Sequence, residues 1–200
     1  MTWPAERLRG ISAATLHESG ATPLPPQVHP LDPGWRVCGR AFTVDLAPGH
    51  NIWLHRAIYA AQPRDVLVAA TSGAYEYGYW GDILTHAAIA RELGGLIIDG
   101  SVRDSADLLR LGFPVFARGL CVRGTGKDAS AGGLGMPITV GSVTVRSGDV
   151  VIGDADGIVV VSPAQIGQVV DRAALREKEE ETIRKRISAG ESTLDLYGLK

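Results

Sequence analysis

The chain has 200 residues, of which 45% are hydrophobic and 21% charged, and its formal net charge at pH 7 is −2. A chain of this length buries one full core, so we expect a single domain over residues 1–200. Basic residues are not in excess, which disfavours nucleic acid and anionic membranes as partners and favours a small molecule.

The cysteines and the first residues bear on the cellular compartment. Cys38 and Cys121 are far apart, with no CxxC pair and no Cys/His cluster at zinc spacing, so neither a disulfide framework nor a structural zinc site is expected. The start of the chain has no basic segment leading into an apolar one, and no run approaches the roughly 18 apolar residues of a membrane span. We therefore expect a cytoplasmic protein.

The first third of the chain predicts alternating helices and strands. We expect a short helix over residues 11–20 and then a loop over residues 23–33, where five prolines exclude a regular helix. β-branched and aromatic residues predict strands over residues 40–44 and 65–70, and a helix is predicted between them over residues 51–61. This alternation indicates an α/β fold.

The clearest helix signal follows a loop rich in glycine and aromatic residues. Asp82 stands where an N-cap is expected, helical spacing continues to Leu93, and Gly94-Gly95 ends the helix. A strand is predicted over residues 95–99, and Asp99-Gly100 predicts a turn after it.

A second junction of the same kind follows. Arg103-Asp104 opens a predicted helix that ends at Leu111, and another strand is predicted over residues 114–117. Asp82 and Asp104 therefore occupy analogous positions, each where a strand leads through a loop into a helix.

The last third predicts strands and one long helix. Beyond a glycine-rich loop over residues 124–135, residues 138–145 and 150–161 have strong β character, and a mixed sheet is expected. The turn at residues 153–157 resembles a calcium loop but lacks the downstream ligands, so a hairpin turn is favoured. Residues 163–200 predict an amphipathic C-terminal helix and tail with a solvated charged face.

The segment 81–84 is a candidate anion-binding site. The N-terminus of a helix presents unpaired N–H groups and a partial positive charge, which suit the carboxylate of a small acid. Gly81 would permit close approach of that ligand. On this segment alone, the alternative that Asp82 merely caps its helix is favoured.

Twenty residues separate Asp82 from Arg103, and Asp104 and Asp107 follow, so a guanidinium and two carboxylates begin the next helix. Arginine binds carboxylates bidentately, and Mg²⁺ takes one or two protein carboxylates while retaining several waters. This cluster can hold a substrate carboxylate together with a hard cation. The alternative is a local Arg–Asp ion pair beside N-terminal helix acids.

Histidines and lysines supply fewer candidates. Four histidines are interpreted as hydrogen-bonded structural residues: His29, His50, His55 and His86. Three lysines belong to the charged tail: Lys178, Lys185 and Lys200. Lys127 lies in a flexible glycine-rich loop, so no lysine is expected to form a Schiff base, and a metal ion is the more plausible electron sink for carbon–carbon chemistry.

Residues 95–104, with Asp82 at its fixed distance, resemble the RraA-like family and specifically its class II pyruvate aldolases. Further matches span nearly the whole chain: Thr15-Leu16-His17-Glu18, Arg123-Gly124-Thr125-Gly126-Lys127, residues 148–157 and residues 194–198. These outer matches resemble the 4-hydroxy-4-methyl-2-oxoglutarate and 4-carboxy-4-hydroxy-2-oxoadipate aldolases more than the ribonuclease-regulating members.

The resemblance implies a swivelling β/β/α-type fold with a mixed central sheet and flanking helices. It implies homotrimers that can pair into homohexamers, with the active site at a subunit interface. It also implies dependence on a divalent metal cation, Mg²⁺ or Mn²⁺, and oxaloacetate decarboxylase side activity.

Site roles follow from the same resemblance, position by position. Asp104 matches the direct metal ligand, and Asp107 matches the acidic position that holds metal-bound water. Arg103 matches the catalytic residue that binds the pyruvyl part of the substrate. Glu18 matches an acidic residue that reaches a neighbouring subunit's site.

The loop before the first of these helices is assigned to substrate binding. Gly81, Asp82, Ile83 and Leu84 match the family's pyruvate-binding loop, and Asp82 also belongs to the network of water and metal. Residues 132–137 depart from the more polar Asn-His-Pro version of the aldolases and are expected to line the distal part of the site.

The predicted reaction is retro-aldol cleavage of a 4-hydroxy-2-oxo dicarboxylic or tricarboxylic acid to pyruvate and a second oxo acid. A base, such as a water positioned by Asp82 or Glu18, removes the C4 hydroxyl proton, and pyruvate leaves as its enolate. The alternative is a non-enzymatic RraA-type regulator that binds a ribonuclease. A methyltransferase is disfavoured because no strand-linked Gly-x-Gly-x-x-Gly loop is present.

Overall fold

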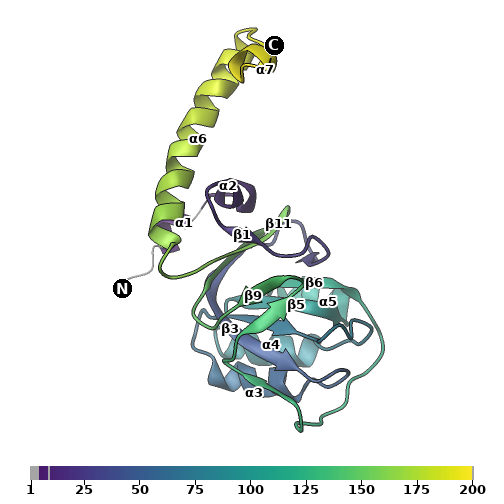
Figure 1. Ribbon diagram of the computed structural model, residues 1–200. Helices are drawn as coiled ribbons and strands as arrows, with labels where there is room; N and C mark the ends of the chain where they lie inside the picture. Colours follow the sequence, from purple (N-terminus) through teal and green to yellow (C-terminus); the bar gives the residue numbers. More distant parts are fainter. Residues whose placement is uncertain (1–4, 9, 200) are drawn as a thin grey trace.

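A mixed β-sheet organises the chain in the computed structural model, which describes residues 5–8 and 10–199 (Figure 1). Its centre consists of four parallel strands: β3 (Val37–Leu46), β4 (Val66–Ala70), β5 (Gly95–Val102) and β6 (Val115–Leu120). Every residue of β4 and β5 is buried, as expected for parallel strands covered on both faces.

Antiparallel strands extend this centre on both sides. Beyond β3 lie β10 (Val150–Asp154), β11 (Gly157–Val161) and β1 (Thr22–Pro23), and β2 (His29–Pro30) pairs with β6 at the other edge. A short strand, β7 (Gly132–Leu134), also pairs with β3. The predicted α/β class with a mixed sheet is thereby confirmed, and the proline-rich loop supplies two short edge strands.

The two faces of the sheet have different covers. Helices α3 (Ile52–Ala60), α4 (Asp82–Ala90) and α5 (Ser105–Leu111) pack on one face. The hairpin of β8 (Ile138–Val140) and β9 (Val143–Val145) packs on the other. Alternation along β4 follows this division, because Leu67 and Ala69 join the helical core while Val66, Val68 and Ala70 join the hairpin core.

Three of the remaining helices pack at the β10–β11 end of the sheet: α1 (Ala5–Leu8), α2 (Ala13–Glu18) and the first half of α6 (Ile166–Ser188). The short helix α7 (Thr193–Leu196) follows α6 and has no buried residue. Figure 1 shows α6 projecting away from the sheet with α7 at its far end. The buried side chains of α6 end at Ala173, so none of the side chains in its second half is buried. Within that chain, no helix is both long and apolar enough to cross a membrane.

Most predicted elements form close to their expected bounds, with one notable change in α4. This helix ends at Ala90 rather than at Leu93. Arg91 is the C-cap and Glu92 has a positive φ of 56°, so the chain leaves the helix before the two glycines are reached.

Candidate active site

Helix α4 begins one residue earlier than predicted. Gly81, in an extended conformation, is the N-cap, and Asp82 is the first helical residue. The carbonyl of Gly81 accepts hydrogen bonds from the N–H and the hydroxyl of Thr85, at 3.1 and 3.0 Å. The prediction that Asp82 caps the helix is therefore wrong, because the backbone of Gly81 already starts the helical ladder and leaves the Asp82 carboxylate beside the positive helix end.

Strand β5 continues to Val102, so the predicted turn at Asp99-Gly100 is also wrong. The register with β6 shifts at this point, which makes the two residues part of a bulge rather than a turn. A Cβ on Gly100 would lie 2.6 Å from Thr71 Cγ2, so close packing explains the glycine. The longer strand delivers Arg103 and Asp104 directly at its end.

Backbone hydrogen bonds fasten the loop before α4 to the end of β5. The N–H of Tyr79 donates to the carbonyl of Ser101 at 3.0 Å, and the N–H of Arg103 donates to the carbonyl of Trp80 at 2.8 Å. These bonds bring the start of α4 beside the start of α5, although the two lie more than twenty residues apart in the sequence.

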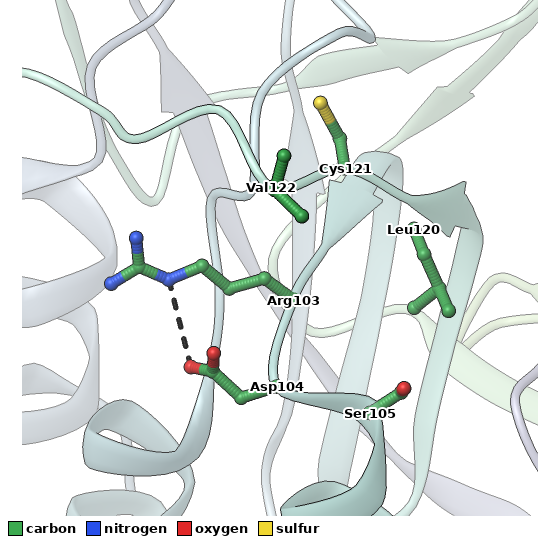
Figure 2. A pocket seen from close by; sticks show the side chains of 6 residues that line it. All are labelled: Arg103, Asp104, Ser105, Leu120, Cys121 and Val122. Carbon is green, nitrogen blue, oxygen red and sulfur yellow. Dashed lines mark ion pairs between the residues drawn. The ribbon is translucent and has the colours of Figure 1, made fainter.

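Asp104 has an unusual backbone conformation at this junction. It is the N-cap of α5 but adopts the left-handed region, with φ 58° and ψ 39°, and its side chain does not cap its own helix. Instead Oδ2 lies 3.3 Å from the N–H of Asp82 and 3.5 Å from Arg103 Nε. Figure 2 shows the guanidinium and the carboxylate projecting together. Aspartate is one of the few non-glycine residues that tolerate this region, and here the conformation turns the carboxylate away from its own helix.

Gly81 is needed for this arrangement on steric grounds. A Cβ at this position would lie 2.2 Å from Asp104 Oδ2 and 3.3 Å from Arg103 Cγ. No side chain tolerates the first distance without displacing the carboxylate. A ligand was predicted to approach Gly81 closely. In this structure the carboxylate of Asp104 makes that close approach.

Arg103 and Asp104 border two hollows. A cleft of about 270 Å³ is lined by Asn51, His55, residues 78–84, Arg103, Asp104, Gly124, Thr125 and Lys127. A second hollow of about 300 Å³ shares Arg103 and Asp104 but is otherwise walled by Ser105, Leu120, Cys121 and Val122 (Figure 2). The first has the mixture of backbone amides, carboxylates and cations that a small organic acid requires.

The donor set of the cleft limits the kind of metal it can hold. Among residues 5–8 and 10–199, no three His, Cys, Asp or Glu side chains lie close enough to cage an ion. Mg²⁺ and Mn²⁺ need only one or two protein carboxylates, with water completing their coordination. Asp104 fits that role because its carboxylate is one-third exposed and its two contacts are long.

Two predicted site residues do not line the cleft. Asp107 lies one turn into α5, and its carboxylate pairs with Arg110 at 2.8 Å. Glu18 is exposed on α2 and pairs with Arg176 of α6 at 2.5 Å. Their roles toward the metal and toward a neighbouring subunit stay predictions.

Residues 132–137 were also expected at the distal part of the site, but none of them lines the cleft. The glycines of this segment belong to β7, which pairs with β3. Apart from the loop before α4, α4 itself, Arg103 and Asp104, the cleft is lined by residues at the start of α3 and in the loop after β6.

Several cleft residues were not among the predicted site residues, and three of them carry polar side chains that bear on the chemistry of the cleft: Asn51, His55 and Lys127. Lys127 was assigned to a flexible loop, yet its Nζ donates to Asn51 Oδ1 at 2.5 Å. Burial, and then the charge of Arg103, lower the pKa of Lys127. Burial, and then the charge of Lys127, lower the pKa of His55. One sequence feature could have identified Lys127 as a cleft residue: it is the last residue of segment 123–127, which resembles the family.

A family model described as RraA-like, Aldolase/RraA, matches residues 11–160. A protein of Halalkalibacterium halodurans, provisionally named 4-hydroxy-4-methyl-2-oxoglutarate aldolase, is 32% identical over 178 residues. The alignment covers 89% of this chain and 84% of that relative.

Two solved structures show the same fold over nearly the whole length. An uncharacterized protein from Pseudomonas syringae pv. tomato is 28% identical with a TM-score of 0.80, covering 94% of this chain and 93% of that one. Streptomyces coelicolor RraAS2, described as an unusual member of the RNase ES inhibitor RraA family, is 29% identical with a TM-score of 0.79. The match covers 90% of this chain and 94% of that one.

Proposed function

This chain belongs to the RraA-like family, and we propose that it is a lyase of that family, releasing pyruvate from a 4-hydroxy-2-oxo acid by retro-aldol cleavage. The observation that carries the proposal is the exposed Asp104 carboxylate, beside Arg103 and the start of α4 in a cleft sized for a small acid. The relative provisionally named an aldolase supports the same reaction class.

The cleft offers positive potential for the pyruvyl end of the substrate. In the first turn of α4, the N–H groups of Asp82, Ile83 and Leu84 have no partners within the helix, and all three residues line the cleft. The guanidinium of Arg103 is about half exposed and bonded only loosely to Asp104, so it retains donors for a carboxylate and a 2-oxo oxygen.

We propose that Asp104 binds Mg²⁺ or Mn²⁺ directly and that Asp107, one helical turn later, acts through water. When bound, such an ion supplies Lewis-acid polarisation of the 2-oxo group. Among the described residues, no three potential ligands lie close enough to cage an ion, which supports a hydrated hard cation over zinc, since zinc prefers nitrogen and sulfur ligands.

Bond cleavage requires one proton acceptor and one stabiliser of negative charge. The C4 hydroxyl proton passes through a water to a carboxylate oxygen of Asp82, with Glu18 from a neighbouring subunit as the alternative acceptor. The C4 oxygen becomes the carbonyl of the second product, and the C3–C4 electron pair moves between C3 and C2. Arg103 donates to the C2 oxygen, where negative charge develops. The enolate then takes a proton at C3 to give pyruvate.

The same residues support a decarboxylase side activity. Loss of CO₂ from oxaloacetate leaves the electron pair of the broken bond in the same pyruvate enolate, which Arg103 stabilises in the same way. No proton acceptor is needed for that step. We therefore propose that oxaloacetate decarboxylation depends on Arg103 and is less sensitive to substitution of Asp82.

We also propose that the cleft lies at a subunit interface of a homotrimer or homohexamer. Large apolar side chains around the site support this arrangement: Val122 is 94% exposed, Ile83 70% and Leu120 58%. Apolar exposure of this kind beside a site marks a contact surface. The cytoplasmic location expected from the sequence remains a prediction.

The test is coupled detection of pyruvate from a panel of 4-hydroxy-2-oxo acids and oxaloacetate, with Mg²⁺ and with excess EDTA. We expect release only with the metal ion. Arg103→Ala and Asp104→Asn should each lower kcat/KM by about a hundredfold or more, because each removes charge stabilisation used in the transition state.

Arg184→Ala is the matched control, since this arginine is exposed on α6 and pairs with Glu180 of the same helix. It should leave pyruvate release unchanged. Turnover of the wild-type chain that persists in excess EDTA would contradict the metal-dependent proposal.

A second candidate function is inhibition of a ribonuclease, which is favoured by the likeness to the Streptomyces coelicolor protein. A regulator would need the surface of the fold but not the charges of the cleft. Tight binding of a ribonuclease by Asp104→Asn, together with no pyruvate release by the wild-type chain, would favour this function.

A further inference from the structure

We propose that Lys127, positioned by Asn51, is a specificity residue that binds the distal carboxylate of the substrate, across the Arg103 guanidinium from Asp104. The inference rests on the proposed function, since it divides one cleft between the two ends of an oxo acid. By binding that carboxylate, Lys127 selects dicarboxylic over monocarboxylic 2-oxo acids.

The side chain of Lys127 is held at a defined place in the cleft. Its Nζ donates to Asn51 Oδ1 at 2.5 Å, and Asn51 Nδ2 donates to the carbonyl of Tyr79 at 2.7 Å. Asn51 is only 5% exposed. Because both ends of its amide are used, Asn51 fixes the ammonium relative to the loop before α4.

The backbone around Lys127 is also fixed, in contrast to the flexible loop expected from the sequence. Gly126 donates to the carbonyl of Gly49 at 2.8 Å and accepts from the N–H of Asn51 at 3.2 Å. The N–H of Asp128 donates to His50 Nδ1 at 2.9 Å. A Cβ on Gly126 would lie 2.5 Å from the same His50 nitrogen, so this contact requires glycine.

The guanidinium of Arg103 extends from Asp104 toward the loop that carries Lys127. The Nε of Arg103 is the atom nearest Asp104, at 3.5 Å. At the other end of the guanidinium, Nη1 lies 3.9 Å from the Cβ position of Gly124, three residues before Lys127. Because all three residues line the same cleft, a ligand bound over Arg103 has Asp104 at the Nε end of the guanidinium and the loop that carries Lys127 near its Nη1 end.

Lys127 is an exposed residue, and its ammonium lines the cleft rather than joining a surface ion pair. Among the residues that the structure describes, none places a carboxylate within ion-pair distance of its Nζ, whereas Lys185 pairs with Glu181 at 2.7 Å. Its charged neighbour in the cleft is Arg103, which lowers its pKa further after burial. A carboxylate bound here would relieve this repulsion and gain a charge-assisted hydrogen bond.

The proposal is tested with two 2-oxo acids of equal chain length that lack the C4 hydroxyl and so cannot undergo the retro-aldol step. 2-Oxoglutarate has a distal carboxylate, and 2-oxopentanoate has a methyl group in its place. Calorimetric titration of the full chain with Mg²⁺ should show 2-oxoglutarate binding about tenfold or more tightly, in line with one charge-assisted hydrogen bond.

Three variants separate a binding role from a structural one. In Lys127→Met the affinity ratio of the two acids should fall to about one while 2-oxopentanoate binds as before, and Lys127→Arg should keep part of the preference. Lys178→Met changes the net charge equally on the exposed surface of α6 and should leave the ratio unaltered.

Two other results would overturn the subsite. One is equal binding of both acids by the wild-type chain, and the other is equal weakening of both acids in Lys127→Met. If pyruvate is still released under those conditions, the proposed function stands and only the subsite fails. If the wild-type chain binds neither acid and releases no pyruvate, both proposals fail.

Discussion

Two arginine–aspartate pairs lie on β5 and just after its end, with their aspartates five residues apart, and they differ in distance and in exposure. Asp99 is paired with Arg118 of β6 at 2.5 Å, with side chains 6% and 18% exposed. Asp104 is paired with Arg103 at 3.5 Å, with side chains 34% and 48% exposed. The first pair is closed and the second remains open to a ligand.

The surroundings reinforce this contrast. The guanidinium of Arg118 also lies 4.0 Å from the centre of the Tyr75 ring, and the N–H of Gly141 approaches the second Asp99 oxygen at 3.4 Å. Asp104 instead combines a left-handed backbone with two long contacts. The fully paired Asp99 therefore stabilises the fold, while the partly unpaired carboxylate of Asp104, at the end of β5, is available for chemistry.

The largest expected effect is a difference in the free energy of unfolding between two variants, in each of which one of these aspartates is replaced with asparagine. Asp99→Asn leaves Arg118 without its buried counter-charge and should lower the free energy of unfolding by about 3 kcal/mol or more. Asp104→Asn keeps a residue that tolerates the left-handed region and should cost under about 1 kcal/mol. Urea unfolding measures both values.

Pyruvate release should distinguish the same two variants in the opposite way. Asp104→Asn should lose activity at a temperature where it is folded. Asp99→Asn should keep activity in proportion to its folded fraction. An Asp104→Asn variant as unstable as Asp99→Asn would show that the open pair is structural after all.

An intermediate effect is expected at Gly81. In Gly81→Ala the new methyl group would lie 2.2 Å from Asp104 Oδ2, so the carboxylate must move. A shift of this size should reduce kcat/KM by about tenfold to a hundredfold, because catalysis is sensitive to ångström displacements. The cost in stability should stay small, since the displaced carboxylate is exposed.

Gly167→Ala is the control for that substitution. Gly167 lies in α6 with no atom within 4 Å of its Cβ position, so alanine there should raise helix stability by about 0.5–1 kcal/mol. Its activity should be unchanged. Equal activity of the two alanine variants would contradict the steric role of Gly81.

The smallest expected effect is a pH dependence of ligand preference. The pKa of Lys127 is lowered by burial and by Arg103, so in the free cleft its ammonium is lost at a lower pH than the usual lysine value of about 10.4. The preference for 2-oxoglutarate over 2-oxopentanoate should therefore decline with rising pH before an ordinary lysine would titrate. His55, whose pKa is lowered by burial and Lys127, is uncharged throughout that alkaline range.

Lys127→Arg is the control, because an arginine keeps its charge over the same range and its ligand preference should not change. Calorimetric titration at several pH values measures the effect. A preference in the wild-type chain that does not decline below the ordinary lysine pKa would contradict the lowered pKa of Lys127.

Sequence reasoning located the open pair because its signals are local. The spacing from Asp82 to Arg103 and Asp104, with helical periodicity after each junction, is visible in the chain itself. The hairpin at residues 153–157 was predicted for the same reason and is confirmed by the pairing of β10 with β11.

The errors arose where distant contacts decide the structure. Asp99-Gly100 has turn propensity, but pairing with β4 and the ion pair to Arg118 keep it in the strand. Lys127 follows glycines that suggest a mobile loop, yet its backbone neighbours are bonded to residues near α3, over seventy positions away. Neither outcome is encoded in a local pattern.

Exchange of the C3 protons of pyruvate in D₂O, followed by NMR, tests directly whether this cleft forms and stabilises the pyruvate enolate. It reports formation of the enolate alone and does not depend on which second oxo acid is used. The wild-type chain with Mg²⁺ should catalyse the exchange, and Asp104→Asn, Arg103→Ala and the wild-type chain in EDTA should not. Absence of exchange in the wild-type chain, or equal exchange in Asp104→Asn, would contradict the assignment of this cleft as a pyruvate-enolate site.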